Sequence, residues 1–380
     1  MEFLPKEIIH LEILPWIPAK SLIRFKCVSK EWYRLINGLT FINLHRKRTL
    51  ESPTLDDMIL VVPHCLDVRV YARFDSVPQT RNNGTLLNKG PAVVVGCCNG
   101  LICLELAHSR FVLVDPLSKK STDYALIPRL DTYIVSREYG FGYDDVGHVY
   151  KIVNIRTCLQ GLQERVHVVN VFSTGTHNWE VVNDFPSWLT KLFCPGVSIN
   201  NKLHWIANNN TDHEHGCIVT LDLHSQVFGE MSIPTINGYP SGGCDLMVTG
   251  KFIYLYMQVR EQDMLVDSFA ELWVMKEYGV TKSWTKLHGF SHRDFPNWWS
   301  RKWLIAFKPK EQAMLTTCFH KPTWYNLHDN STTKLDVLDI RYNHTDTRHA
   351  KPWVCVQTLA STTLFQTSTP TSSRLHRSIT

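Results

Sequence analysis

The chain has 380 residues, of which 44% are hydrophobic and 20% charged, so its composition excludes a largely disordered protein. No stretch reaches the roughly 18 apolar residues of a membrane helix, and the N-terminus lacks the basic and apolar segments of a secretion signal, so we expect a cytoplasmic protein that can also be nuclear. The net charge of +5 comes from residues 1–50, which hold nine basic and four acidic side chains, while the rest of the chain is balanced. This distribution gives no support to a nucleic-acid groove and favours an acidic protein partner for residues 1–50.

Residues 4–37 show the periodicity of helices. After Leu4 and Pro5, apolar residues recur at helical spacing up to Ile13, and Pro15 and Pro18 should end this first helix. Two further helical segments follow, with apolar positions at Leu22, Phe25 and Val28 in one and at Trp32, Leu35 and Ile36 in the other, which Ser29 can cap. Three helices in about 35 residues bury too little surface to be stable alone, so we expect this module to dock on another surface.

From residue 58 onward, short β-rich runs separated by turn residues replace the helical pattern. Examples are MILVV at 58–62, AVVVG at 92–96, VHVVNVF at 166–172 and CIVTLDL at 217–223. No long helices alternate with these runs, which argues against a doubly wound α/β fold. A turn followed by a strand with a large apolar residue recurs at Tyr124, Trp179, Phe228, Trp284 and Leu335, at steps of 49 to 56 residues. A period near 50 is typical of a kelch-type blade, so we predict a β-propeller of about six units over 52–360, with a two-sheet sandwich as the alternative.

Other clusters of reactive residues give little indication of catalysis or metal binding. The eleven cysteines include no CxxC pair and are expected to be reduced, mostly buried thiols. His213, Glu214, His215 and Cys217 lack a second ligand pair at a fitting spacing, so we interpret 208–216 as a solvated loop. The GFGYDD run from Gly140 lacks the third glycine and the helix of a phosphate loop, and we interpret it as a turn between strands. No nucleophile elbow, HExxH or paired-carboxylate motif is present, and we expect no catalysis, cofactor or metal ion.

The segment from Leu4 to Ile36 resembles an F-box. The matching residues, in the order and spacing of that family, are Leu4, Pro5, Glu7, Ile13, Leu14, Pro18, Lys20, Ser21, Leu22, Arg24, Phe25, Val28, Lys30 and Trp32. The rest of the chain resembles the plant F-box-associated domain through CNGLICL at 98–104, YGFGYDDVGHVYKIVNI at 139–155, GVSINNKLHWIA at 196–207 and ELWVMKEYGVTKSWTKL at 271–287. Within this family the chain looks most similar to the S-locus F-box-like branch. Pro15, Trp16 and Ile17 depart from the usual F-box pattern.

The resemblance implies an α+β multidomain protein with a three-helix F-box at 1–50 and an all-β F-box-associated domain at 52–360. The Ser/Thr-rich composition of 361–380, with no acidic residue, predicts a flexible tail. The resemblance also implies a non-catalytic role, in which the F-box binds a Skp-type adaptor, and a cullin complex through it, while the β-domain holds a protein to be ubiquitinated. The residues expected at the adaptor are Leu4, Pro5, Glu7, Ile13, Leu14, Pro18, Leu22, Arg24, Val28 and Trp32. Among them, Leu4, Pro5, Leu14 and Leu22 are expected to form an exposed hydrophobic surface.

The candidate contacts to a protein substrate are aromatic and basic. They are Trp188, Trp298, Trp299 and Arg301, because tryptophan and arginine are enriched at binding hot spots. Membership of the S-locus-like branch would imply recognition of S-ribonucleases in pollen. The alternative functions are a ligase-independent binding scaffold and a glycan-binding module. We expect neither nucleic acid nor a membrane among the partners.

Overall fold

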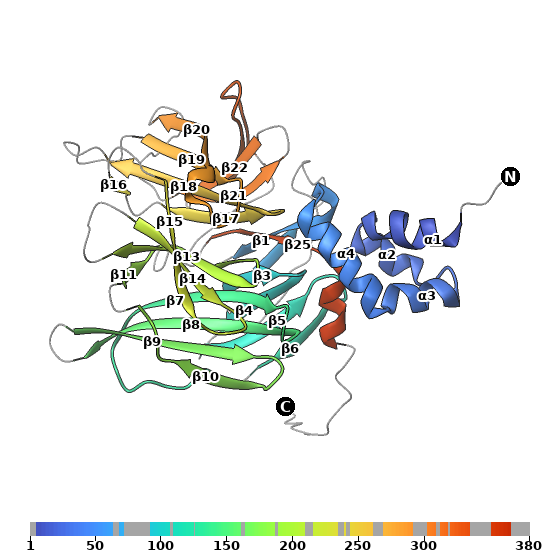
Figure 1. Ribbon diagram of the computed structural model, residues 1–380, viewed down its shortest axis with the longest axis horizontal. Coiled ribbons are helices and arrows are strands. Elements are labelled where there is room, and N and C mark those ends of the chain that lie inside the picture. Colours follow the sequence, from blue (N-terminus) through green and yellow to red (C-terminus); the bar gives the residue numbers. More distant parts are fainter. Residues whose placement is uncertain are drawn as a thin grey trace, which may run out of the picture.

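A computed structural model of the chain shows a helical N-terminal module attached to a ring of β-sheets (Figure 1). It describes residues 5–63, 68–71, 92–106, 109–124, 126–160, 164–186, 189–209, 216–234, 239–240, 244–260, 269–291, 302–308, 312–317, 320–334 and 351–365. The helices of the N-terminal module (residues 5–51) are α1 Lys6–Ile8, the π-helical turn η1 Ile9–Ile13, the 3₁₀ turn η2 Leu14–Trp16, α2 Ala19–Phe25, α3 Lys30–Asn37 and α4 Leu39–Glu51. The 3₁₀ turn η3 Leu55–Asp57 leads from this module into the sheets. None of the described helices is long and apolar enough to cross a membrane.

The first three helical segments begin where the sequence predicts, but α2 ends at Phe25, so Val28 lies in the turn after this helix and not in it. Pro5 and Pro18 precede α1 and α2, and the Ser29 side chain accepts a 3.1 Å hydrogen bond from the Trp32 amide at the start of α3. Pro15 lies in η2, and the backbone becomes extended at Ile17, so the first helix ends there.

Helix α4 is an element that the sequence did not predict. Its buried side chains are Phe41, Ile42, His45 and Thr49, which follow one face of the helix. Two of these four are polar, so the face carries no continuous apolar stripe from which the helix could be predicted. Phe41 and Ile42 complete a core with Leu22 and Ile36 of α2 and α3.

The strands form six sheets among the described residues. In chain order they are β1 Met58–Pro63, β2 Val68–Tyr71, β3 Val93–Cys98, β4 Leu101–Leu106, β5 Arg110–Asp115, β6 Lys120–Asp123, β7 Ile134–Asp144, β8 Val149–Gln160, β9 Glu164–Ser173, β10 Asn178–Val182, β11 Leu189–Leu192, β12 Val197–Ile199 and β13 Lys202–Asn209. They continue with β14 Gly216–Asp222, β15 Phe228–Ser232, β16 Tyr239–Pro240, β17 Asp245–Thr249, β18 Phe252–Arg260, β19 Phe269–Met275, β20 Trp284–Ser291, β21 Lys302–Lys308, β22 Gln312–Thr317, β23 His320–Asn326, β24 Thr332–Lys334 and β25 Trp353–Val356. Every strand pair is antiparallel, as expected for meandering sheets joined by short turns.

The six sheets are the blades of a β-propeller, as predicted. Each sheet contacts the next through its innermost strand, in the order β25, β3, β7, β12, β17, β21 and back to β25. The ring is closed by one sheet, of order β2-β1-β25, in which Leu60 near the N-terminal end pairs with Val354 near the C-terminal end. We call this the closing sheet. Because the inner strands form a closed circle, the alternative of a two-sheet sandwich is wrong.

The repeat of about 50 residues corresponds to the outer strands of the blades. Trp179, Phe228 and Trp284 lie on β10, β15 and β20, and Tyr124 directly follows β6. Leu335 lies outside the described residues. The prediction of a turn at GFGYDD is wrong: Gly140 to Asp144 belong to β7, and the turn follows at 145–148.

The prediction of a flexible tail from residue 361 is also wrong at its beginning. A 3₁₀ helix, η7 Leu359–Phe365, follows β25, and Ser361 is fully buried. Buried contacts made by Leu359 and Ala360 order this segment in spite of its Ser/Thr-rich composition. Residues 366–380 lie outside the described part of the chain.

Candidate functional site

The surface of the N-terminal module contains part of the predicted adaptor contacts. Pro5, Glu7 and Arg24 are exposed, and Ile13 and Val28 are exposed by 41% and 62%. Two other predicted contacts, Pro18 and Trp32, are partly buried. Leu4 lies outside the described residues.

Leu14 and Leu22 are not part of this surface. Their exposed fractions are 1% and 0%, and both pack in the core of the module with Ile36 and Phe41. The prediction that they form an exposed hydrophobic surface is therefore wrong. The physical reason is that α4 and the C-terminal segment cover the side of α2 that would be open in a module of three short helices.

Two exposed apolar residues of the first helix were not among the predicted contacts. Ile8 is exposed by 41% and Leu11 by 52%. They lie three residues apart and therefore share a face of the helix. The helical spacing of these residues was visible in the sequence, but it did not indicate which face the rest of the chain leaves uncovered. Isolated exposed apolar residues are ordinary, whereas a group on one helix face is typical of a docking surface.

The unusual Pro15-Trp16 pair is accommodated without loss of the fold. Pro15 is buried, whereas Trp16 is 58% exposed. The Arg48 guanidinium lies 5.1 Å from the centroid of the Trp16 ring and 3.4 Å from a carboxylate oxygen of Glu12. These contacts connect η2 to α4, so the departure from the family pattern changes the edge of the module and leaves its core intact.

Helix α4 also connects the module to the propeller. Arg46 Nη1 donates a 2.6 Å hydrogen bond to Asp145 Oδ1, and its guanidinium lies 4.9 Å from the centroid of the Tyr143 ring. The Asp145 amide in turn donates to Asn201 Oδ1 at 2.8 Å. The Arg46 side chain thus contacts the blade that contains β7, and Asp145 connects this contact to the next blade. Part of the positive charge of residues 1–50, that of Arg46, is therefore paired with an acidic side chain of the propeller.

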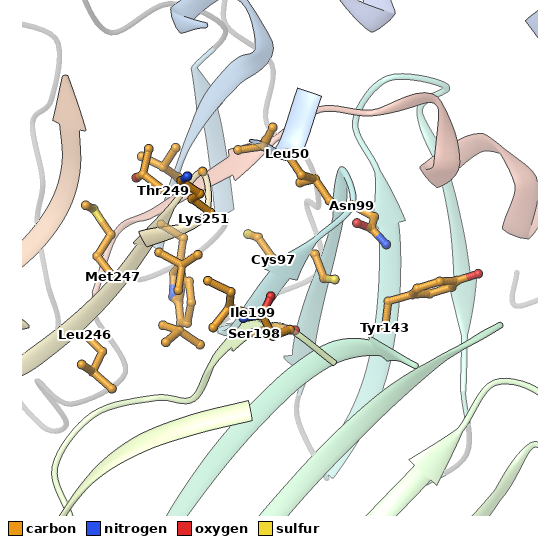
Figure 2. A pocket seen from close by; sticks show the side chains of 18 of the residues that line it. Leu50, Cys97, Asn99, Tyr143, Ser198, Ile199, Leu246, Met247, Thr249 and Lys251 are labelled. Atoms are coloured by element: carbon orange, nitrogen blue, oxygen red, sulfur yellow. The ribbon is translucent and has the colours of Figure 1, made fainter. Parts of the chain in front are cut away.

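A cavity of about 680 Å³ lies between α4 and the inner strands, on the propeller axis (Figure 2). It is lined by Leu50 of α4 and by residues at the ends of inner strands, among them Cys97, Tyr143, Ile199 and Met247. Burial raises the pKa of the Cys98 thiol, which also lines the cavity, to about 12. The thiol therefore stays protonated at neutral pH and is a poor nucleophile or metal ligand.

A buried ion pair lies at the wall of this cavity. Lys351 Nζ lies 2.6 Å from Asp245 Oδ1, with exposed side-chain fractions of 5% and 0%, and it also donates to the Leu246 carbonyl at 3.1 Å. The other Asp245 oxygen accepts from the Leu304 amide at 3.0 Å. Because Lys351 precedes β25 while Asp245 and Leu304 belong to β17 and β21, this network joins three neighbouring blades at the ring closure.

Two glycines allow the inner strands of neighbouring blades to approach closely. The Gly196 amide donates to the Tyr139 carbonyl at 2.8 Å, and Trp205 Nε1 donates to the same oxygen at 2.9 Å. A Cβ atom on Gly196 would lie 2.6 Å from the Trp205 ring, and one on Gly140 would lie 2.7 Å from it. The motifs YGFG and GVSINNKLHW, which identified the F-box-associated domain in the sequence, therefore meet in one blade-to-blade contact.

The face of the ring opposite the N-terminal module is where the inner strands begin. The far ends of these strands, such as Ile199 and Thr249, line the cavity with α4, so the first residues Ile134, Leu189 and Lys302 lie at the other end of the sheets. We call this the distal face. The predicted substrate contacts Trp188, Trp298, Trp299 and Arg301 lie outside the described residues, in segments that directly precede β11 and β21.

The described part of the distal face contains exposed apolar side chains that were not predicted. Leu126 is exposed by 56% and Tyr133 by 74%, in the connection that enters β7. The Tyr133 carbonyl accepts a 3.1 Å hydrogen bond from the Leu159 amide, which fixes the backbone at this position. Leu126 and Tyr133 lie in an irregular connection, and no periodic pattern in the sequence indicates that they are exposed.

Of the four residues considered for a metal site in the sequence, Cys217 is the one that the structure describes. Cys217 lies in β14 and is buried, and burial raises its pKa to about 12. His213, Glu214 and His215 lie outside the described residues. Over the part of the chain that the structure describes, no three His, Cys, Asp or Glu side chains come together as metal ligands do.

Comparison with known families agrees with this architecture. The model of the F-box-associated β-propeller domain matches residues 75–360, and that of the F-box domain matches residues 4–44. The chain belongs to the F-box-associated β-propeller family. In this family an F-box is combined with a propeller in proteins that serve as substrate adaptors of Skp-cullin-F-box ligases and are generally non-catalytic.

Relatives are found among plant F-box proteins. The Arabidopsis thaliana F-box/kelch-repeat protein At3g23880 is 28% identical over 84% of this chain and 90% of its own length. The Arabidopsis thaliana F-box protein CPR1 is 26% identical over 89% of this chain and 86% of its own length. The solved structure of YjhT is 10% identical, with a TM-score of 0.43 over 67% of this chain and 87% of that chain, and this likeness supports no further conclusion.

Proposed function

We propose that this F-box protein is the substrate-recognition subunit of a Skp-cullin-F-box ubiquitin ligase. The observation that carries the proposal is the exposed apolar face of Ile8 and Leu11 on an F-box that is fixed to a closed propeller. An F-box with this face can bind a Skp-type adaptor, and the adaptor connects it to the cullin complex. We expect a second protein to bind on the distal face of the propeller, away from the F-box.

The apolar face suits burial against an adaptor. Covering it removes apolar surface from water, which is the main favourable term in stable protein interfaces. The exposed Arg24, together with Lys20 and Lys30, would favour encounter with an acidic adaptor surface. Of the contacts predicted from the sequence, Leu14 and Leu22 act through the core. The others remain candidate contacts in this proposal: Leu4, Pro5, Glu7, Ile13, Pro18, Arg24, Val28 and Trp32.

We place substrate binding on the distal face. Tyr133 and Leu126 are its described apolar candidates. Trp188, Trp298, Trp299 and Arg301 remain candidates from the sequence alone, since they lie outside the described residues. A tyrosine at 74% exposure provides contact area with little loss of side-chain entropy on binding. Binding on this face would keep the substrate away from the adaptor.

Affinity purification from plant cells treated with a proteasome inhibitor, followed by mass spectrometry, tests the proposal. The wild-type chain should capture a Skp-type adaptor, a cullin and at least one further protein. The double variant Leu4→Ala, Pro5→Ala should lose adaptor and cullin and retain the further protein. Tyr133→Ala should do the reverse. The proposal is contradicted if the wild-type chain captures no adaptor, or if the double variant captures as much adaptor as the wild-type chain does.

Further measurements separate the alternative functions. If the chain is a ligase-independent scaffold, deleting residues 1–50 leaves the half-life of the captured protein unchanged. If the chain is a ligase subunit, it shortens that half-life only when the F-box is present. A glycan-binding module would bind a glycan array through the propeller. Recognition of S-ribonucleases, which the S-locus-like resemblance implies, requires expression in pollen and a ribonuclease among the captured proteins. Cytoplasmic and nuclear localisation likewise remains a prediction, which a fluorescent fusion would test.

A further inference from the structure

The start of β1 and the end of β25, which pair in the closing sheet, both lead directly to the F-box. Strand β1 begins at Met58, directly after η3 and seven residues after the last residue of α4. Strand β25 pairs with β1 in antiparallel register, so its last residue, Val356, lies opposite Met58. The Gln357 amide then donates a 2.7 Å hydrogen bond to the Asp57 carbonyl. The chain therefore returns at its C-terminal end to the place where it left the F-box.

The segment that follows, residues 357–365, packs on the F-box. We call it the C-terminal strap. Leu359 and Ala360 have exposed fractions of 0% and 9%, and they share a core with Leu14, Leu22 and Ile36 of the F-box. The strap also contacts α4, which belongs to the same core. Residues more than 300 positions apart in the sequence thus form one hydrophobic cluster.

The other side of the strap is fixed to the propeller. Thr358 Oγ1 donates a 2.9 Å hydrogen bond to the Asn99 carbonyl of the propeller. Within the strap, Ser361 Oγ donates to the Thr358 carbonyl at 3.0 Å. Gly100 has a φ of +88°, and a Cβ atom there would lie 3.0 Å from the Thr358 nitrogen. Leu364 packs against the propeller core. The Asn99-Gly100 turn is therefore shaped for the strap as well as for the hairpin between β3 and β4.

We propose that the C-terminal strap is a positioning element of the adaptor site, with Leu359 as its central residue. It completes the F-box core and holds the exposed face of Ile8 and Leu11 at one orientation to the propeller. Because the strap follows the strand that closes the ring, the F-box is complete only after the last blade has formed. Adaptor binding then depends on the propeller, and incompletely folded chains bind poorly. This inference rests on the proposed function for its partner, and on the contacts of Leu359 for its structural part.

The test compares Leu359→Ala with Leu272→Ala in the full chain. Leu272 is equally buried, at 0% exposure, but lies in β19 away from the F-box, so it is a matched control for the loss of core contacts. Hydrogen exchange is measured over residues 19–42, and affinity is measured with a purified Skp-type adaptor. We expect Leu359→Ala to raise exchange over 19–42 at least tenfold, to leave β8 and β14 unchanged and to weaken adaptor binding at least tenfold. Leu272→Ala should change neither quantity over the F-box.

The outcomes distinguish this inference from the proposed function. Unchanged exchange over 19–42 in Leu359→Ala, or an equal rise in Leu272→Ala, would overturn the structural part. Raised exchange with unchanged adaptor affinity would overturn the role of the strap in binding. A wild-type chain that binds no adaptor would overturn the proposed function, while the exchange measurement would still decide whether the strap completes the F-box core.

Discussion

Arg46 and Asp145 form a 2.6 Å charged hydrogen bond between the F-box helix α4 and the turn after β7. Their side chains are exposed by 20% and 49%, so solvent screens the pair, and we expect a coupling free energy of about 0.5–1 kcal/mol. Denaturant unfolding of Arg46→Ala, Asp145→Ala and the double variant measures this coupling. Arg46→Ala should lower the free energy of unfolding more than Asp145→Ala does, because it also removes the contact with Tyr143. Strictly additive effects of the two substitutions would contradict a direct pair.

Gly196→Ala should destabilise the protein by about 1–3 kcal/mol, because its new methyl group would lie 2.6 Å from the Trp205 ring in a packed core. Gly289→Ala is the matched control, since its Cβ atom would meet nothing closer than 3.5 Å, and it should cost little or stabilise slightly. Thermal unfolding of both variants checks the prediction. Equal effects would show that the close approach of the two inner strands does not require glycine.

Lys351→Met should cost about 3–5 kcal/mol, because it removes the positive charge of Lys351 from beside the fully buried Asp245 carboxylate. Adding Asp245→Asn should recover part of this loss, since an amide oxygen can still accept from the Leu304 amide. The free energies of unfolding of the single and double variants decide the matter. If the double variant is less stable than Lys351→Met, the charge of Asp245 is not the source of the cost.

Burial lowers the pKa of His204 from 6.5 to about 4. As a neutral ring it can donate from Nδ1 to the Val197 carbonyl at 3.3 Å and accept at Nε2 from the Tyr278 hydroxyl at 2.8 Å. The unfolded chain binds a proton near pH 6.5 and the folded chain only near pH 4. The stability present above pH 6.5 is therefore lost as the pH falls through this interval, by an amount of the order of 3 kcal/mol.

The variant His204→Phe should flatten this pH dependence between pH 6.5 and 4, although it lowers stability at neutral pH. His148→Asn, on an exposed turn, is the control and should keep the slope of the wild-type chain. Urea unfolding across the pH range provides the measurement. An unchanged slope in His204→Phe would show that another group causes the acid sensitivity.

Much of the fold could be predicted because its signals are local or repeated. The F-box segment places prolines, a serine cap and apolar residues at helical spacing, and the propeller repeats a turn and a large apolar residue at Trp179, Phe228 and Trp284. Both signals follow from the backbone geometry of short helices and meandering strands. The family resemblance is carried by residues that build these elements.

The elements that complete the F-box core could not be predicted, because their partners are distant in the sequence. The buried face of α4 includes His45 and Thr49, so it shows no apolar period. Leu359 and Ala360 belong to a segment whose composition resembles a solvated tail, and their packing in the core of the F-box explains their order. Because neither α4 nor the segment of Leu359 and Ala360 could be predicted, the sequence alone suggests that Leu14 and Leu22 are exposed. For the same reason, the sequence does not indicate that Ile8 and Leu11 lie on a helix face that the rest of the chain leaves uncovered.

The most direct test of the proposed role is the affinity of the purified full chain for a purified Skp-type adaptor, measured by isothermal titration calorimetry. We expect a complex with one adaptor per chain, and we expect Leu11→Asp to abolish it because a charge would enter the centre of the apolar face. Val181→Asp, at a propeller residue that is 59% exposed, should bind as the wild-type chain does. No complex with the wild-type chain, or equal affinity for Leu11→Asp and Val181→Asp, would contradict the assignment of this F-box as an adaptor-binding module.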